Sequence, residues 1–92
     1  MPYINQKKRL QIEPGLSIAS DVIETTGDLC YAIYWLISNY AQYPPGKENV
    51  GPEMDFDSAS RALVACECAK LEFYRRFVAP YEDKKIQENG DI

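Results

Sequence analysis

Apolar residues recur at helical spacing in the middle of this chain, between two groups of turn-forming residues. One stripe runs along a single face and consists of Leu29, Ile33, Leu36, Ile37, Tyr40 and Ala41. The segment Thr25-Thr26-Gly27-Asp28 precedes it, with side chains that can cap a helix and a glycine that tolerates positive φ. Pro44-Pro45-Gly46 follows and stops the pattern. These signals predict a helix near residues 28–43.

A second helical pattern fills the C-terminal third of the chain. Its apolar stripe consists of Ala59, Ala62, Leu63, Cys66, Ala69, Phe73 and Phe77. Asp55 or Asp57 can cap its start, and Pro80 should kink or end the helix near Ala79. We therefore expect a long helix near residues 57–79 and a terminal helix over 81–88 that ends at Asn89-Gly90.

The first quarter of the chain has a weaker pattern. Residues 1–13 predict an N-terminal arm with one helical turn, and Pro14 suits the first turn of a helix of about ten residues. The apolar positions of that helix are Ile18, Ala19, Val22 and Ile23. Residues 44–55 predict a surface loop. Together these elements indicate an all-α fold: a single domain over residues 1–92, built as a helical hairpin or a unit of three to four helices.

Composition and charge exclude several function classes. The chain has 92 residues, which is enough for one small domain, and a net charge of −4 from 10 basic and 14 acidic residues. This balance disfavours bulk nucleic-acid binding and attachment to an anionic membrane. The longest apolar runs are too short to cross a bilayer, and the N-terminus lacks the apolar core of a secretion signal. We expect a soluble protein of the cytoplasm.

Cysteine and histidine content narrows the chemistry further. The chain has no histidine, which excludes a Ser-His-Asp triad, a Cys-His dyad and a Cys2His2 zinc site. Cys30, Cys66 and Cys68 are odd in number and predict reduced, buried, apolar side chains rather than disulfides. Cys66 and Cys68 also project in opposite directions from a helix, so they cannot share a metal ion. We expect no catalytic residue, no metal and no cofactor.

The helix near residues 28–43 has a second face that is rich in aromatic residues. Tyr31, Tyr34 and Trp35 lie away from its main stripe, and one short chain cannot cover both faces. A lone helical unit of this length without disulfides or metal also has little stability in reserve. The sequence therefore predicts a homo-oligomer, at least a dimer at micromolar concentration, with Trp35 or Tyr34 between subunits. The alternative is that these rings are half-exposed surface residues.

The densest polar cluster lies at the end of the long predicted helix. Tyr74, Arg75, Arg76 and Tyr81 combine rings that stack on a nucleobase with guanidinium groups that suit phosphate oxygens, so we predict that they bind an anionic ligand. Arg75 and Arg76 diverge by about 100°, so only one can point into a given groove. The alternative is structural, because Glu72 stands three and four residues before the two arginines and can pair with both.

The tail of the chain carries a longer motif. It reads Glu67-Cys68-Ala69-Lys70-Leu71-Glu72-Phe73-Tyr74-Arg75-Arg76, then Val78-Ala79-Pro80-Tyr81-Glu82-Asp83-Lys84-Lys85-Ile86 and Glu88-Asn89-Gly90-Asp91. The motif, the opening Met1-Pro2-Tyr3-Ile4, and Gly27-Asp28-Leu29 with Tyr31-Ala32-Ile33 resemble a family of small, functionally uncharacterised proteins of prokaryotes and their phages. The resemblance implies no established activity and transfers no catalytic residue.

These observations favour a non-enzymatic, oligomeric binding protein whose partners are copies of itself and an anionic, nucleotide-like small molecule. Small phage proteins of this size can act as sponges for nucleotide immune signals, and by analogy this is the most concrete form of the hypothesis. The alternative is a structural or protein-interaction adaptor without a small ligand. A metal-dependent enzyme built on carboxylate pairs such as Glu67 with Glu72 is a weaker third class.

Overall fold

The computed structural model describes residues 3–44 and 54–92 and is helical throughout, as the sequence predicts. Its elements are α1 (Gln6–Ser20), α2 (Thr26–Gln42), α3 (Phe56–Phe73), a π-helical turn (Tyr74–Val78) and α4 (Ala79–Asn89). No strand occurs within these two described ranges. The all-α prediction is confirmed.

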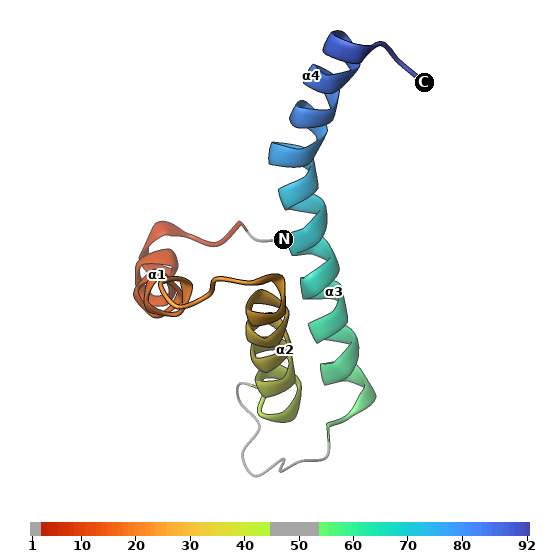
Figure 1. Ribbon diagram of the computed structural model, residues 1–92. Coiled ribbons are helices and arrows are strands. Elements are labelled where there is room, and N and C mark those ends of the chain that lie inside the picture. The colour runs from red at the N-terminus through yellow and green to blue at the C-terminus, as the bar shows by residue number, and fades with distance from the viewer. Residues whose placement is uncertain (1–2, 45–53) are drawn as a thin grey trace.

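Helices α2 and α3 form an antiparallel hairpin (Figure 1), and among the described residues this is the one place where two helices pack side by side. The contact is made by small residues: Ala41, Ser58 and Ala62 are buried. Small side chains let the two backbones approach closely. The predicted helical hairpin is therefore present, and its buried residues lie at the end nearest residues 44 and 54.

Side-chain caps fix the starts of both hairpin helices. The Thr25 side chain accepts a hydrogen bond from the Asp28 N–H at 3.0 Å, and the Asp28 carboxylate accepts from the N–H groups of Glu24 and Thr25. These bonds, that of Glu24 first, lower the pKa of Asp28. Gly27, expected in a break, instead lies inside the first turn of α2.

Asp55 caps α3 by accepting a hydrogen bond from the Ser58 N–H at 2.7 Å, in agreement with one of the two predicted caps. Of the predicted loop at residues 44–55, positions 45–53 lie outside the described residues. Pro44, Met54 and Asp55 are non-helical.

Helix α1 corrects the prediction for the N-terminal region. It begins at Gln6 rather than at Pro14, because the Asn5 side chain accepts a hydrogen bond from the Lys8 N–H at 2.9 Å and caps the helix. Pro14 therefore lies inside the helix, where its cost is the loss of one backbone hydrogen bond. The predicted arm over residues 1–13 is reduced, among described positions, to residues 3–5.

The π-helical turn joins α3 to α4 in one long rod (Figure 1). Pro80 has no N–H to donate to the carbonyl four residues earlier, and the chain absorbs this by one wider turn in which the Ala79 N–H bonds to the Tyr74 carbonyl. Pro80 thus changes the helix type without ending the helix. The rod ends at Gly90, which has φ of 88° and donates to the Ile86 carbonyl at 2.7 Å.

The single chain is open and extended. It measures 56 × 29 × 29 Å, and its radius of gyration is 16.8 Å, against about 12 Å for a compact domain of this length. Ala41 and Ala62 are the only buried apolar residues in the described part of the chain. The expectation of buried cysteines fails here, because Cys30 is exposed and Cys66 and Cys68 are half-buried. Their prediction as free thiols agrees with the structure.

Candidate functional site

The carboxylate of Glu72, at the end of α3, forms ion pairs with two arginines. Arg75 binds its Oε1 through a terminal guanidinium nitrogen, and Arg76 Nε lies 2.5 Å from the same oxygen. In the sequence analysis, the pairing of Glu72 with both arginines was the structural alternative to a ligand site, and the structure contains both pairs. Because one negative charge serves two positive ones, the three side chains keep a net positive charge.

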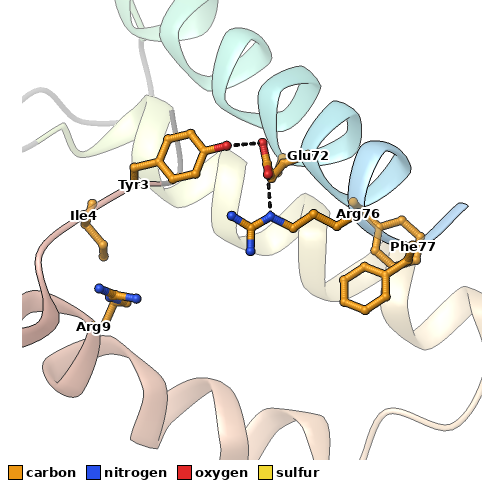
Figure 2. A pocket seen from close by; sticks show the side chains of 8 residues that line it. Tyr3, Ile4, Arg9, Glu72, Arg76 and Phe77 are labelled. Carbon is orange, nitrogen blue, oxygen red and sulfur yellow. Dashed lines mark hydrogen bonds and ion pairs between the residues drawn. The ribbon is translucent and has the colours of Figure 1, made fainter. Parts of the chain in front are cut away.

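Tyr3 completes the cluster from the other end of the chain (Figure 2). Its hydroxyl donates a hydrogen bond to Glu72 Oε2 at 2.5 Å and accepts one from Arg75 at 3.1 Å. The Arg76 guanidinium lies 5.9 Å from the centre of the Tyr3 ring, within the range of a cation–π contact. The contacts of Tyr3 thereby hold the extended residues 3–5 against α3.

These contacts shift the acidity of Glu72. The hydrogen bond from Tyr3, followed by that from Arg76, lowers the pKa of Glu72 from 4.5 to about 2. The same contacts raise the pKa of both arginines above its ordinary value, with the Glu72 hydrogen bond as the first cause. Glu72 is therefore a fixed anion, and Arg75 and Arg76 are fixed cations, at neutral pH.

A groove of about 430 Å³ opens beside this cluster, between the N-terminal residues and α3. Its walls combine cations with aromatic rings, and the residues that line it are Tyr3, Ile4, Arg9, Ala69, Glu72, Phe73, Arg76 and Phe77. The rings of Phe73 and Phe77 stack with centroids 5.5 Å apart, and both are exposed. The volume lies within the range of small-molecule sites. We name this the Tyr3–Arg76 groove.

Arg9 supplies the second cation of the groove. It projects from the first turns of α1, on the wall opposite Arg76 (Figure 2). Within residues 3–44 and 54–92, no carboxylate lies within ion-pair distance of Arg9. The groove therefore holds one cation already committed to Glu72 and one cation that has no anion among the described residues.

The four residues predicted as a ligand site do not converge. Arg76 lines the Tyr3–Arg76 groove and Arg75 does not, in keeping with the divergence of neighbouring helical positions. The nearby Glu82 carboxylate raises the pKa of Tyr74 above 10.0. The Lys85 ammonium lies 5.6 Å from the centre of the Tyr81 ring. Both tyrosines thus have partners on α4, outside this groove.

Sequence reasoning assigned Phe73 and Phe77 to the apolar stripe of the long helix rather than to a site, and it missed two polar members of the groove, Tyr3 and Arg9. Both lie in the segment interpreted as an arm, and a contact between residues 69 positions apart leaves no trace in local spacing. The signal that could have found Arg9 is Asn5, a capping residue that places the basic run Lys7-Lys8-Arg9 on a helix.

A metal site and a membrane-spanning helix are both absent from residues 3–44 and 54–92. Among the described parts of the chain, no three acidic or cysteine side chains lie close enough together to hold a metal ion. In those parts there is also no helix with both the length and the apolar character needed to cross a membrane.

Comparison with known proteins identifies the family of the chain. No curated protein and no solved structure is similar to this chain at a significant level. The family described as a domain of unknown function, DUF6899, matches residues 1–92. The match extends over every element described above, from the Tyr3 contact to α4, and the chain belongs to the DUF6899 family.

Proposed function

We propose that this protein is a non-enzymatic, homo-oligomeric helical protein that binds an anionic, nucleotide-like small molecule in the Tyr3–Arg76 groove. The observation that carries the proposal is the pair of cations on opposite walls, Arg76 on the rod and Arg9 on α1. Arg9 has no anion among the described residues, so a phosphate could pair with it without breaking an existing ion pair.

The aromatic part of the groove supports the base-binding half of the proposal. Phe73 and Phe77 present two exposed, stacked rings beside the cations. Planar rings stack on nucleobases with little sequence preference, and guanidinium groups bind phosphate through paired N–H donors. The combination fits a mononucleotide or a small cyclic nucleotide better than a purely apolar ligand.

The corresponding activity is to hold the bound nucleotide without converting it to a product. The groove contains a carboxylate that is already bound by two arginines and a tyrosine, so Glu72 is poorly placed to accept a proton from a substrate. Sequestration of a nucleotide immune signal, by analogy with small phage sponges, is the most concrete form of this role.

Calorimetric titration with a panel of linear and cyclic nucleotides tests the proposal. Wild type should bind at least one of them, and Arg9→Ala and Arg76→Ala should weaken that binding roughly 10- to 100-fold, as expected when a charge-assisted bond is lost. Arg61→Ala is the matched control, because Arg61 pairs with Asp57 at the opposite end of α3. Chromatography should recover the nucleotide unchanged, whereas a product would indicate an enzyme.

An adaptor without a small ligand is the second candidate. It is favoured by the exposure of large apolar side chains such as Trp35 on α2 and Leu16 on α1. A protein partner retained through several purification steps, together with no heat across the nucleotide panel, would support the adaptor and exclude the nucleotide site.

A further inference from the structure

An apolar groove of about 650 Å³ separates α1 from α2. Leu16 and Ala19 line it from α1, and Val22 lines it from the link that follows α1. Tyr31, Trp35 and Leu36 line it from α2. Asp28, at one end, is its charged lining residue, and that carboxylate is already bound by two backbone N–H groups. We name this the α1–α2 groove.

Nothing in the described chain fills the α1–α2 groove. No Cα of α1 lies within 8 Å of a Cα of another helix in residues 3–44 and 54–92. Trp35 is 55% exposed and Leu16 is 46% exposed. The apolar sides of α1 and α2 thus face each other across a gap that their own side chains do not close.

The solvent-accessible area of the chain indicates how much surface a partner would bury. The chain exposes 8072 Å², whereas a compact monomer of 10.5 kDa exposes roughly 5,400 Å². The difference, about 2,600 Å² per chain, is comparable to the area that each partner buries in a large obligate homodimer. A small molecule in a groove of this size would cover only a small part of that excess.

We propose that a second copy of this chain docks in the α1–α2 groove, with Trp35 of each copy buried at the interface. The same chain offers apolar side chains for such a contact outside the Tyr3–Arg76 groove, because the rod continues past the packed end of the hairpin with Leu71 and Ile86 exposed. An isologous arrangement uses one groove on each copy and closes after two subunits.

This inference rests on the homo-oligomer of the proposed function and assigns its interface, without depending on the nucleotide. The Tyr3–Arg76 groove and the α1–α2 groove have no lining residue in common. A negative nucleotide titration would therefore leave the interface unaffected, and an interface variant can be assayed without any ligand.

Dilution of wild-type protein gives the first measurement. Trp35 is the only tryptophan of the chain, so its emission reports directly on the α1–α2 groove. Sedimentation should show a dimer or larger species at micromolar concentration, and dilution should produce monomers while the Trp35 emission moves to longer wavelength. A wild-type monomer at high concentration would overturn both this inference and the homo-oligomer.

A matched pair of variants on α1 gives the second measurement. Leu16→Glu places a charge in the groove, whereas Ile18→Glu makes the same change two residues away, where the side chain does not line the groove and is 73% exposed. Leu16→Glu should weaken association about 30-fold or more, in the range of an interface hot spot, with helix content retained. Ile18→Glu should associate like wild type.

The two measurements together decide the location of the interface. If wild type associates but Leu16→Glu behaves like Ile18→Glu and the Trp35 emission does not change on dilution, the copies meet elsewhere and this inference is wrong. Circular dichroism identifies a variant that has failed to fold, and in that case the wild-type dilution series alone decides, through the Trp35 emission.

Discussion

The Tyr3 hydroxyl and the Glu72 carboxylate, 69 positions apart in the chain, are joined by a hydrogen bond of 2.5 Å. This bond fastens the segment before α1 to the end of α3, at the point where Arg75 and Arg76 also bind Glu72. One carboxylate therefore determines both the position of the N-terminal segment and the orientation of the Arg76 guanidinium that lines the groove.

Tyr3→Phe should raise the pKa of Glu72 from about 2 toward 4.5, because the hydrogen bond from Tyr3 is the largest cause of its depression. The arginines remain, so the pKa should stay below its ordinary value. NMR titration of the glutamate carboxyl carbons measures it. Tyr81→Phe is the control, since that ring contacts Lys85 rather than Glu72. An unchanged Glu72 pKa in Tyr3→Phe would contradict the contact.

Stability should depend on pH through Glu72. Its folded pKa of about 2 lies below the ordinary 4.5, so its contribution is fully present above about pH 4.5 and is lost as the pH falls toward 2. We expect the difference in unfolding free energy between wild type and Glu72→Gln to shrink over that window. Urea unfolding at several pH values measures the difference, in which the other carboxyl groups cancel. A difference independent of pH would argue against the lowered pKa.

Thr25→Ala should destabilise the protein by about 1 kcal/mol, the typical cost of losing an N-cap side chain. The Thr25 hydroxyl accepts the Asp28 N–H at 3.0 Å, and alanine leaves that donor without its partner. Thr26→Ala is the control, because Thr26 lies in the first turn and has no part in the capping box. Equal losses of stability in thermal unfolding of the two variants would show that the cap contributes nothing.

Pro80→Ala should convert the π-helical turn to regular α-helix, because alanine can donate the N–H that proline lacks. Tyr74 and Glu82 are eight residues apart, and the extra residue of the π turn aligns them as if they were seven apart, two full turns of a regular helix. Removing that residue from the turn should separate them. The pKa of Tyr74 should then fall back toward 10.0, as NMR titration of its ring can show.

Glu82→Gln is the comparison for that experiment, since it removes the charge without touching the backbone. It should lower the pKa of Tyr74 while leaving the π turn in place. If Tyr74 titrates in Pro80→Ala as it does in wild type, the wider turn does not depend on proline.

The hairpin could be predicted because its signals are local. Thr25 and Asp55 cap their helices as the sequence indicates, and the apolar spacing locates α2 and the start of α3 closely. The predicted end of α3 near Ala79 is wrong, because the π-helical turn begins after Phe73. Pro14 misled the prediction of α1, because proline also survives inside an exposed helix when an earlier residue, here Asn5, provides a good cap.

The candidate site was predictable only in its intrahelical part. The pairing of Glu72 with Arg75 and Arg76 follows from spacings of three and four. Tyr3 and Arg9 join through tertiary structure, which no local pattern encodes. The tyrosines, Tyr74 and Tyr81, were expected beside the arginines, but the π turn and α4 give them partners of their own.

The way in which α1 is held suggests a hierarchy of local stability along the chain. One end is fastened by the exposed polar contacts of Tyr3 and the other by the capping box at Thr25, and no helix packs closely against the part between them within the described residues. Such contacts open at far less cost than the buried alanines of α2 and α3. In an isolated chain, the amides of α1 should therefore exchange with solvent as one cooperative unit, ahead of the hairpin and without global unfolding.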